Sequence, residues 1–533
     1  MPLLVPNQAP PEGYYAQNLR AVVDTVCHQY ADLLTSDETY FANSALALSE
    51  PALRLLARLL SRTKTYIRLD SLSYADVGDV SKALHELSEA DLISLDASGE
   101  ASEILNLLTV TELKATFAHS DLKGRKSELI ETIRARHDDM TIRVRISERQ
   151  PWLHVIASQV FEVFCLLFFG NNMQKIEEFV IRDLGVTRFE AYEMDPAFRL
   201  FRDRRAIDRY QELQGLAETV ESLGKTVTAE DAEDICRSLM TPEEDRVFEL
   251  RRSRILNALG RNLERVNEHE LALRCYRSSS AHPARERMMR ILKKDGRVEV
   301  LEEVRAEILD GPRSYEERQF ALRFAKPRTP QPTIELRESL APTDEVASIE
   351  NFAAQQLVDE GCQAWHLENL LPNGLFGLAY WDWLYASVRG SFVHPFQTAP
   401  LDLYWPEFFE VRQDTCEDPL AKPEELKARI LAIADTKRGI SSQLVAWSVL
   451  SRSLLNTILG AMKTEQIQGL LRIVTEDLRQ FRAGFPDLTV VDQQGVIAFV
   501  EIKGPGDQLR PNQRLWIERL MQAQFNVYVW RFR

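Results

Sequence analysis

The stretch that decides the fold reads Phe485-Pro486-Asp487-Leu488-Thr489-Val490-Val491, then Asp492-Gln493-Gln494-Gly495, then Val496-Ile497-Ala498-Phe499-Val500-Glu501-Ile502-Lys503. Two apolar runs flank a polar segment that contains glycine, which predicts two strands joined by a tight turn. Side chains alternate across a strand, so Glu501 and Lys503 share one face and their apolar neighbours point to the other. Folding the hairpin back brings Asp487 close to Glu501. Two carboxylates and an ammonium group then meet at the edge of an apolar sheet.

This combination of charges points to a metal site. Two close carboxylates repel each other, and each loses hydration when it is buried. A hard divalent cation such as Mg²⁺ or Mn²⁺ resolves the conflict, because it takes carboxylate and carbonyl oxygens together with water. A lysine beside it can stabilise charge on a phosphoryl group or orient a water. The pattern favours phosphodiester hydrolysis; the alternative is a surface hairpin with a solvated Glu/Lys pair.

A longer motif carries a resemblance to a known superfamily. Pro486-Asp487…Glu501-Ile502-Lys503-Gly504-Pro505, followed by Asp507, Leu509, Gln513 and Trp516, resembles the PD-(D/E)xK nucleases and, more narrowly, the VRR-Nuc domain. A helix is predicted from residue 511 and a last strand over 525–532, so strand, helix and strand form a right-handed crossover in an α/β core. The resemblance implies that Gln513 lies towards the site. From sequence alone it could equally be an exposed residue of a first helical turn.

Size and composition bound the architecture. A chain of 533 residues is too long for one core, which predicts three or four domains. Its 45% hydrophobic and 27% charged residues are typical of soluble globular proteins. The net charge of −15 is not that of a simple nucleic-acid coat protein, but phosphate binding depends on local patches. We expect a mostly α multidomain protein with a C-terminal α/β nuclease domain.

The cellular setting is predicted from cysteines and apolar segments. The six cysteines include no Cys-x-x-Cys pair, which argues against structural zinc and a disulfide framework and fits a reducing cytosol. The first residues lack a basic region followed by a long apolar run, so no signal peptide is expected. Residues 153–169 are very apolar but contain His154, Gln159 and Glu162, which favours a buried helix over a membrane span. A cytoplasmic, nucleoid-associated protein without membrane partners is expected.

The first two predicted domains are residues 1–100 and 101–140. The first is helical, with a short strand at 66–69 that suggests a winged-helix-like or purely helical module. In the second, Thr109 with Glu112 forms a capping-box pattern, and a basic turn precedes another helix. This helical pair resembles a SAP domain, a small DNA-binding motif. The resemblance implies that Lys123, Arg125 and Lys126 contact phosphates; the alternative is a solvated basic turn.

The third predicted domain, residues 141–330, is helical and rich in arginine. Residues 262–283 resemble one tetratricopeptide unit, but no clean run of copies follows, so we predict a degenerate repeat region. Arginines such as Arg252 and Arg254 have two interpretations: a solvated face paired with interleaved acids, or a pocket for a terminal DNA phosphate. Three prolines at 327–332 predict a linker before the fourth domain, residues 340–533.

A third carboxylate is needed for a typical two-carboxylate metal site, and several precede the hairpin. Together with the SAP-like and repeat-like regions, the segments 366–382 and 395–404 resemble the Fanconi-associated nuclease family over nearly the whole chain. In that family the Glu thirteen residues ahead of a Trp-Asp pair binds metal, which implies Glu368 rather than Glu407 or Asp402. The sequence departs from better-known members at Gln508 and Asn512, where basic residues are expected, and has no obvious ubiquitin-binding zinc finger.

The resemblance implies a structure-specific, metal-dependent DNA nuclease of bacterial type. It implies 5′-flap endonuclease and 5′-to-3′ exonuclease action on branched or flap DNA in interstrand-crosslink repair; repair-protein partners are not readable. One or two Mg²⁺ or Mn²⁺ ions would be bound by Asp487, Glu501, Glu368 and the Ile502 carbonyl, with Lys503 acting on water. The alternatives are a Holliday-junction resolvase, against which the large asymmetric front half argues, and an inactive repair scaffold, against which the intact acidic pair and lysine argue.

Overall fold

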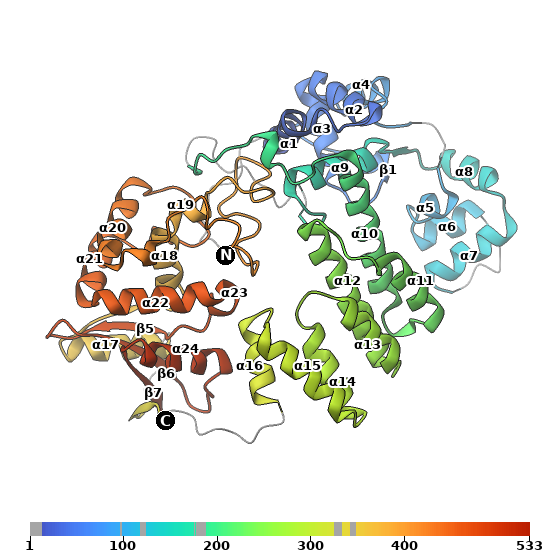
Figure 1. Cartoon of the computed structure of the whole chain (residues 1–533). Helices are drawn as coiled ribbons and strands as arrows, with labels where there is room; N and C mark the ends of the chain where they lie inside the picture. The colour runs from blue at the N-terminus through green and yellow to red at the C-terminus, as the bar shows by residue number, and fades with distance from the viewer. Residues whose placement is uncertain are drawn as a thin grey trace.

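The computed structural model describes residues 13–95, 99–117, 124–174, 176, 188–324, 333–341 and 348–533. Figure 1 shows the N-terminal helices in blue, a column of green and yellow-green helices, and a sheet with its own helices in orange and red. Helices dominate the first two bodies, and the five-stranded sheet lies in the third. The prediction of a mostly helical multidomain chain with a C-terminal α/β domain is confirmed.

The N-terminal body is a helical bundle with a small sheet. Its elements are α1 (Tyr14–Tyr30), α2 (Ser36–Ala47), α3 (Glu50–Leu60), α4 (Val80–Glu89) and α9 (Ala157–Phe169), with the antiparallel strands β1 (Tyr66–Arg68) and β2 (Trp152–His154). The helix α9 contacts α1, α2 and α3. By its position in the sequence this helix falls in the predicted domain 141–330. It packs with the first segment instead because it is apolar on most sides and must be covered all round.

The buried helix expected at 153–169 is therefore confirmed for 157–169, whereas Leu153 belongs to β2. None of the helices in the described ranges combines the length and the apolar character that a membrane span needs.

Four short helices form a separate small body. They are α5 (Ala101–Leu105), α6 (Val110–Phe117), α7 (Lys126–Arg136) and α8 (Asp139–Ser147), and their apolar residues form a second hydrophobic cluster together with Tyr66 of β1 and Trp152 of β2. The predicted capping box starts α6, because the Thr109 N–H donates to Glu112 Oε2 at 2.7 Å and the Glu112 N–H donates to Thr109 Oγ1 at 3.3 Å. Lys123 lies outside the described residues.

The middle body is a series of helices. They are α10 (Arg204–Leu223), α11 (Ala229–Leu239), α12 (Arg246–Arg265), α13 (His269–Ser278), α14 (Ala284–Lys294), α15 (Val298–Asp310) and α16 (Tyr315–Arg323). Neighbours in sequence contact each other, as repeat units do. A glycine is needed at 260 because a Cβ there would lie 2.8 Å from the Tyr276 ring of α13. These helices share one hydrophobic cluster with the N-terminal bundle, and the predicted linker at 327–332 lies outside the described residues.

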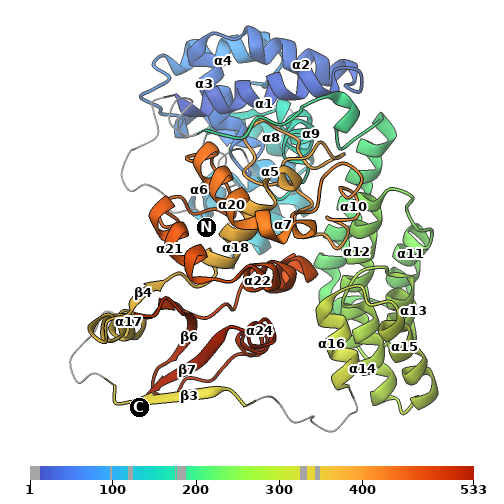
Figure 2. The ribbon, with the colours of Figure 1, turned by 60° about the vertical axis from the view of Figure 1, so that its left-hand side comes forward.

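The C-terminal sheet has the strand order β3-β7-β6-β5-β4. Its strands are β3 (Glu335–Ser339), β4 (Gln363–His366), β5 (Leu488–Val491), β6 (Ile497–Lys503) and β7 (Asn526–Phe532). The predicted hairpin is the antiparallel pair β5 and β6, and the predicted crossover through α24 (Pro511–Gln522) makes β7 parallel to β6. Figure 2 shows α17 (Ile349–Asp359) and α24 on opposite faces of the sheet, in agreement with two separate hydrophobic clusters there.

A group of helices is inserted between the neighbouring strands β4 and β5. They are α18 (Leu370–Ala379), α19 (Trp381–Leu384), α20 (Leu426–Thr436), α21 (Arg452–Ala461), α22 (Thr464–Glu476) and α23 (Leu478–Phe481). They pack on the α24 face of the sheet in one apolar core. The middle body touches this insertion where the Tyr315 N–H donates to Asp477 Oδ2 at 3.2 Å and the Tyr315 and Phe481 rings lie 5.5 Å apart.

Candidate active site

Strand register brings the predicted acidic residues together. Leu488 pairs with Val500 across the antiparallel hairpin, so Asp487 and Glu501 are the next opposed positions. Leu488 also pairs with His366 of β4, which carries the chain just beyond that strand to the same end. There the Glu368 N–H donates to the Asp487 carbonyl at 3.2 Å. Three carboxylate residues from three chain segments therefore meet at one edge of the sheet.

Short polar contacts hold the centre of this group. The Lys503 Nζ lies 2.7 Å from Glu501 Oε1 and donates to Gln513 Oε1 at 3.1 Å. The Ile502 N–H donates to Asp487 Oδ2 at 2.7 Å. Gln513 also accepts the Arg510 N–H at 3.0 Å, which fixes its side chain at the start of α24. Lysine and glutamine are thereby positioned by two different elements.

Burial makes this charge cluster unusual. Glu501 is 0% exposed, and its Oε2 accepts no hydrogen bond from any residue in the described ranges. Burial raises the pKa of Glu501 to about 7, with the Asp487 charge adding to the rise and Lys503 opposing it. Burial also raises the pKa of Asp487, against the Ile502 N–H and Lys503. The protein alone does not neutralise this pair.

Glu368 occupies the rim of the site. Its side chain is exposed, and its backbone has φ = +39°, a left-handed conformation that is strained for a residue with a side chain. Asn369 donates to Glu368 Oε1 at 2.7 Å and accepts the Phe485 N–H at 3.1 Å. The strained turn therefore keeps Glu368 beside the segment that leads into Asp487.

The donor set suits a hard divalent cation. Its side-chain donors Asp487, Glu501 and Glu368 offer carboxylate oxygens, and one oxygen of Glu501 is buried without a hydrogen-bond donor among the described residues. Within the described ranges, however, no group of three or more His, Cys, Asp or Glu side chains is already arranged to hold a metal ion. Glu501 instead forms an ion pair with Lys503, and Asp487 accepts the Ile502 N–H. Glu368 accepts a hydrogen bond from Asn369. The residues therefore have the chemistry that a divalent cation needs, while their carboxylates contact protein groups in this structure.

The other two carboxylates weighed for the third position have structural partners. Asp402 is buried in a two-pronged salt bridge with Arg412, at 2.7 and 2.8 Å. Glu407 forms an ion pair with Arg246 of α12. Their negative charge is already compensated, so Glu368 is the carboxylate of the three that lies at the hairpin.

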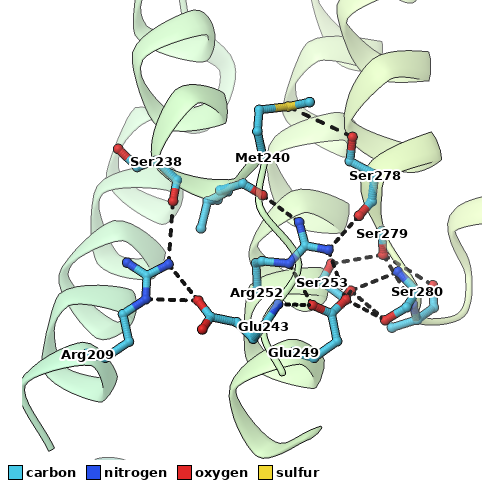
Figure 3. Close-up of polar contacts among 12 residues, drawn as sticks. Arg209, Ser238, Met240, Glu243, Glu249, Arg252, Ser253, Ser278, Ser279 and Ser280 are labelled. Carbon is cyan, nitrogen blue, oxygen red and sulfur yellow. Dashed lines mark hydrogen bonds and ion pairs between the residues drawn. The ribbon is translucent and has the colours of Figure 1, made fainter. Parts of the chain in front are cut away.

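Arg252 requires a correction. It was expected to contact DNA, but its side chain is 1% exposed and its guanidinium is fully engaged (Figure 3). It donates twice to Glu249, at 2.8 and 2.9 Å, and to the carbonyls of Leu239 and Ser278. Burial works to raise the pKa of Glu249, but the hydrogen bonds from Arg252 and its other partners bring it down to about 2. A phosphate has no access to this guanidinium, which instead ties α12 to the ends of α11 and α13.

The remaining predicted DNA contacts lie on accessible surfaces. Arg254 of α12 is exposed, and partial desolvation together with the charges of Arg479 and Arg251 lowers its pKa. Arg125 is exposed at the start of α7. Lys126 donates to the Asn106 carbonyl at 2.8 Å, and its pKa is lowered by partial burial and by Lys64. Gln513 is half-buried and accepts a hydrogen bond from Lys503.

Sequence reasoning missed three candidates next to these residues. The Glu350 charge acts on Asp487, yet a Glu in the first turn of α17 looks like any helix-start residue. Arg479 lies close enough to Arg254 for their charges to repel, and in the sequence its one weak signal is that it lies eight residues ahead of Asp487, with Arg482 between them. Lys64 adjoins Lys126 only through the fold.

Comparison with known proteins identifies relatives over the full length. The model of the VRR-NUC domain matches residues 421–533, and that of the FAN1 HTH domain matches residues 13–94. The Fanconi-associated nuclease 1 homolog of Pseudomonas aeruginosa is 31% identical, over 99% of this chain and 97% of its own. The homolog of Arabidopsis thaliana is 28% identical, over 99% of this chain and 68% of its own.

A solved structure gives the same result. The crystal structure of paFAN1 bound to 2nt 5′flap DNA with gap has a TM-score of 0.81 and 29% identity, and the match covers 99% of both chains. The nucleases of this family are metal-dependent. The resemblance seen in the motif is confirmed: the chain belongs to the Fanconi-associated nuclease 1 family and is a structure-specific DNA nuclease that hydrolyses phosphodiester bonds.

Proposed function

We propose that this nuclease cuts 5′-flap DNA endonucleolytically, resects it in the 5′-to-3′ direction and serves in interstrand-crosslink repair, in the cytoplasm at the nucleoid. The observation that carries the proposal is the full-length likeness to paFAN1, whose structure contains 5′ flap DNA. The asymmetric front half supports it, because a single site flanked by helical bodies suits a branched substrate with two unlike arms.

The metal ligands follow from the chemistry of the sheet edge. Asp487, Glu501, Glu368 and the Ile502 carbonyl would hold one or two Mg²⁺ or Mn²⁺ ions, since all of these donors are oxygens. When bound, the metal supplies Lewis acidity at the phosphoryl oxygen and activates water. The buried Glu501 supports this assignment, because among the described residues Lys503 is the one cation in contact with it and its Oε2 accepts no hydrogen bond.

Lys503 has the position of a group that handles the attacking water. Its Nζ is held between Glu501 and Gln513, and Lys503 as a residue is 7% exposed, so the ammonium is oriented in a largely buried place. An ammonium in that place stabilises negative charge that develops on the phosphoryl group and orients a water for attack. Gln513 then acts through the lysine, in addition to any contact with DNA.

The front half supplies phosphate contacts. Arg125, Lys126 and, with them, Lys123 would bind the backbone of a duplex arm from the small four-helix body. Arg254, close to Arg479, would bind phosphate near the nuclease domain, since two neighbouring arginines that form no ion pair with an acid in the described ranges favour a planar oxyanion.

Three labelled substrates test the proposal: a 5′ flap, a 3′ flap and a four-way junction, each with Mn²⁺ and with Mg²⁺. We expect cutting of the 5′ flap near its branch, and none by Asp487→Ala at equal DNA binding. Preferred cutting of the 3′ flap would contradict the polarity. Paired symmetric cuts in the junction would favour the resolvase alternative.

A further inference from the structure

A basic cavity of about 410 Å³ opens in the middle body between α12 and α14. Five positively charged side chains line it, with one carboxylate among them: Arg261, Arg265, Arg287, Arg290, Lys294 and Glu264. This concentration of positive charge stands out in a chain whose net charge is −15. Such a patch attracts a polyanion by local potential, whatever the total charge.

Three of these cations have no acidic partner among the residues that the structure describes. Glu264 neutralises Arg287 at 2.6 Å, and Glu286 neutralises Arg290 at 2.7 Å. Arg261 makes no hydrogen bond or ion pair with any part of the chain that the structure describes. Arg265 donates only to the neutral Asn262 Oδ1, at 3.3 Å. Uncompensated arginine at the mouth of a cavity is available to an incoming anion.

Lys294 is the third of them and is held in place by a chain of contacts. Its Nζ lies 3.3 Å from His269 Nε2, and His269 Nδ1 lies 2.9 Å from Asp295. In this arrangement Nδ1–H donates to Asp295 and Nε2 accepts from the lysine. The ammonium is thus fixed at the cavity without losing its charge to a carboxylate.

The cavity continues a line of charge that begins at the nuclease domain. Arg254, Arg261 and Arg265 are spaced by seven and four residues, so they lie along one face of α12 over about 16 Å. The first of them lies near Arg479 of α23, in the insertion that precedes Asp487. We call Arg254, Arg261, Arg265 and Lys294 the α12–α14 track.

The lining favours a phosphate chain over an acidic peptide. A peptide needs apolar anchor pockets, but Ile291 is the one apolar residue in the lining. Aromatic rings nearby are covered, because Arg290 lies 4.8 Å from the Phe320 ring centre and Lys293 lies 4.9 Å from that of Phe324. Binding through charge alone, without base stacking, is indifferent to sequence and strongly weakened by salt.

We propose that the α12–α14 track binds the phosphate backbone of single-stranded DNA and receives the flap strand as it leaves the nuclease domain. This inference rests on the proposed flap substrate and adds a path for the strand that no relative's name describes. It predicts that a long flap is held more tightly than a short one, because only a long flap reaches the cavity.

The first test measures binding without cleavage. The full-length triple variant Arg261→Gln, Arg265→Gln and Lys294→Gln is compared with wild type for a fluorescent oligothymidine of about 20 nucleotides, longer than the ~4–16 that a single-strand-binding fold covers. In EDTA across a salt series, we expect roughly tenfold weaker binding at low salt and a salt slope smaller by about 2. The matched control replaces Arg237, Arg274 and Arg277 by Gln on α11 and α13, outside the cavity.

Equal binding and slope in the two triple variants would overturn the proposal. Polyglutamate serves as a second ligand. If the cavity variant lost binding to polyglutamate but kept binding to oligothymidine, the proposal would also be overturned, and the cavity would be assigned to an acidic protein partner. Circular dichroism of both variants shows that they are folded.

The second test measures cleavage of flaps of about 20 nucleotides and of one nucleotide. We expect the cavity variant to lose the advantage of the long flap at low substrate concentration, while it cuts the one-nucleotide flap at the wild-type rate. If the ratio of long-flap to one-nucleotide-flap cleavage were the same in the variant and in wild type, the proposed path for the flap strand would be contradicted. Failure of wild type to cut either flap would instead overturn the flap function, and the oligothymidine result would still stand on its own.

Discussion

The catalytic hairpin and the network around Arg252 both bury charge, and they do so in opposite ways. Arg252 finds a bidentate carboxylate and two backbone carbonyls, and Glu249 collects further donors until its pKa falls to about 2. Glu501 has one close cation, an oxygen without a donor, and a pKa raised by burial to about 7. In the sequence both sites are charged clusters of similar kind. In the structure the charges of the Arg252 network are balanced by protein groups, whereas Glu501 keeps an oxygen without a donor among the described residues.

Whether a buried charge is fully hydrogen-bonded separates a structural role from a chemical one in this protein. A buried charge whose hydrogen-bonding groups are all occupied locks helices together. A buried charge that the fold leaves under-compensated costs stability and is kept for what it binds.

Replacing Glu501 by Gln should separate activity from stability most sharply. We expect flap cleavage to fall by about a thousandfold or more, about 4 kcal/mol in the barrier, because a metal-binding carboxylate is lost. The metal-free variant should be at least as stable as wild type, since the repulsion with Asp487 is removed. Cleavage rates and denaturant unfolding in EDTA measure both; a variant that is inactive because it is unfolded would break the contrast.

Replacing Arg252 by Met should do the reverse. We expect a loss of about 3–5 kcal/mol in the free energy of unfolding, because Glu249 and two carbonyls remain buried without their partner. Flap cleavage per folded molecule at low temperature should stay near wild type. If the variant is stable but binds DNA more weakly, Arg252 has the phosphate role that its burial argues against.

The pH dependence of stability should follow Glu501. Its pKa is raised from 4.5 to about 7 in the folded protein, so the folded state keeps a proton that the unfolded state releases. The resulting stabilisation is present below about pH 4.5 and is lost as the pH rises through about 7. In EDTA, wild type should lose roughly 1–3 kcal/mol more than Glu501→Gln between pH 5 and pH 8. Equal losses in urea unfolding would contradict an uncompensated carboxylate.

Removing the side chain of Gln513 should have a smaller effect. It accepts from Lys503 Nζ at 3.1 Å, so Gln513→Ala should lower kcat by about 10- to 100-fold through a less well placed lysine. DNA affinity measured in EDTA distinguishes the two roles. An effect on affinity alone would make Gln513 a DNA contact, as the family resemblance implies.

The smallest effect is expected at the four-helix body. The double change Arg125→Gln and Lys126→Gln should weaken binding of duplex DNA a few-fold and lower the salt slope by about 2, since about 0.9 counterions are released per phosphate contact. Binding curves at several salt concentrations measure this. An unchanged slope would leave the basic turn as a solvated surface.

Sequence reasoning succeeded where local pattern determines structure. Alternation in residues 485–503 predicted the hairpin, and the apolar face around Trp516 predicted α24 and the parallel strand that follows. Glu368 had no such pattern. It meets Asp487 through pairing of β4 with β5 across the helical insertion, and only the family resemblance singled it out.

Pattern failed where partners decide the outcome. The local sequence does not distinguish Arg252 from Arg254. Arg252 is buried between α12 and its neighbouring helices, whereas Arg254, two residues later, is exposed. Likewise, the apolar helix α9 could have covered several bodies, and only its contacts with α1, α2 and α3 place it. Both are choices of tertiary packing among locally equivalent alternatives.

The helical insertion between β4 and β5 has a consequence for synthesis on the ribosome. Glu368 and Asp487 are neighbours in the sheet, yet α18 to α23 separate them along the chain, and β6 and β7 come later still. Contacts of such long range form only after the intervening chain has emerged and folded. A growing polypeptide therefore exposes its helical front half before any cutting centre exists, and DNA cutting can begin only after β7 has emerged from the ribosome.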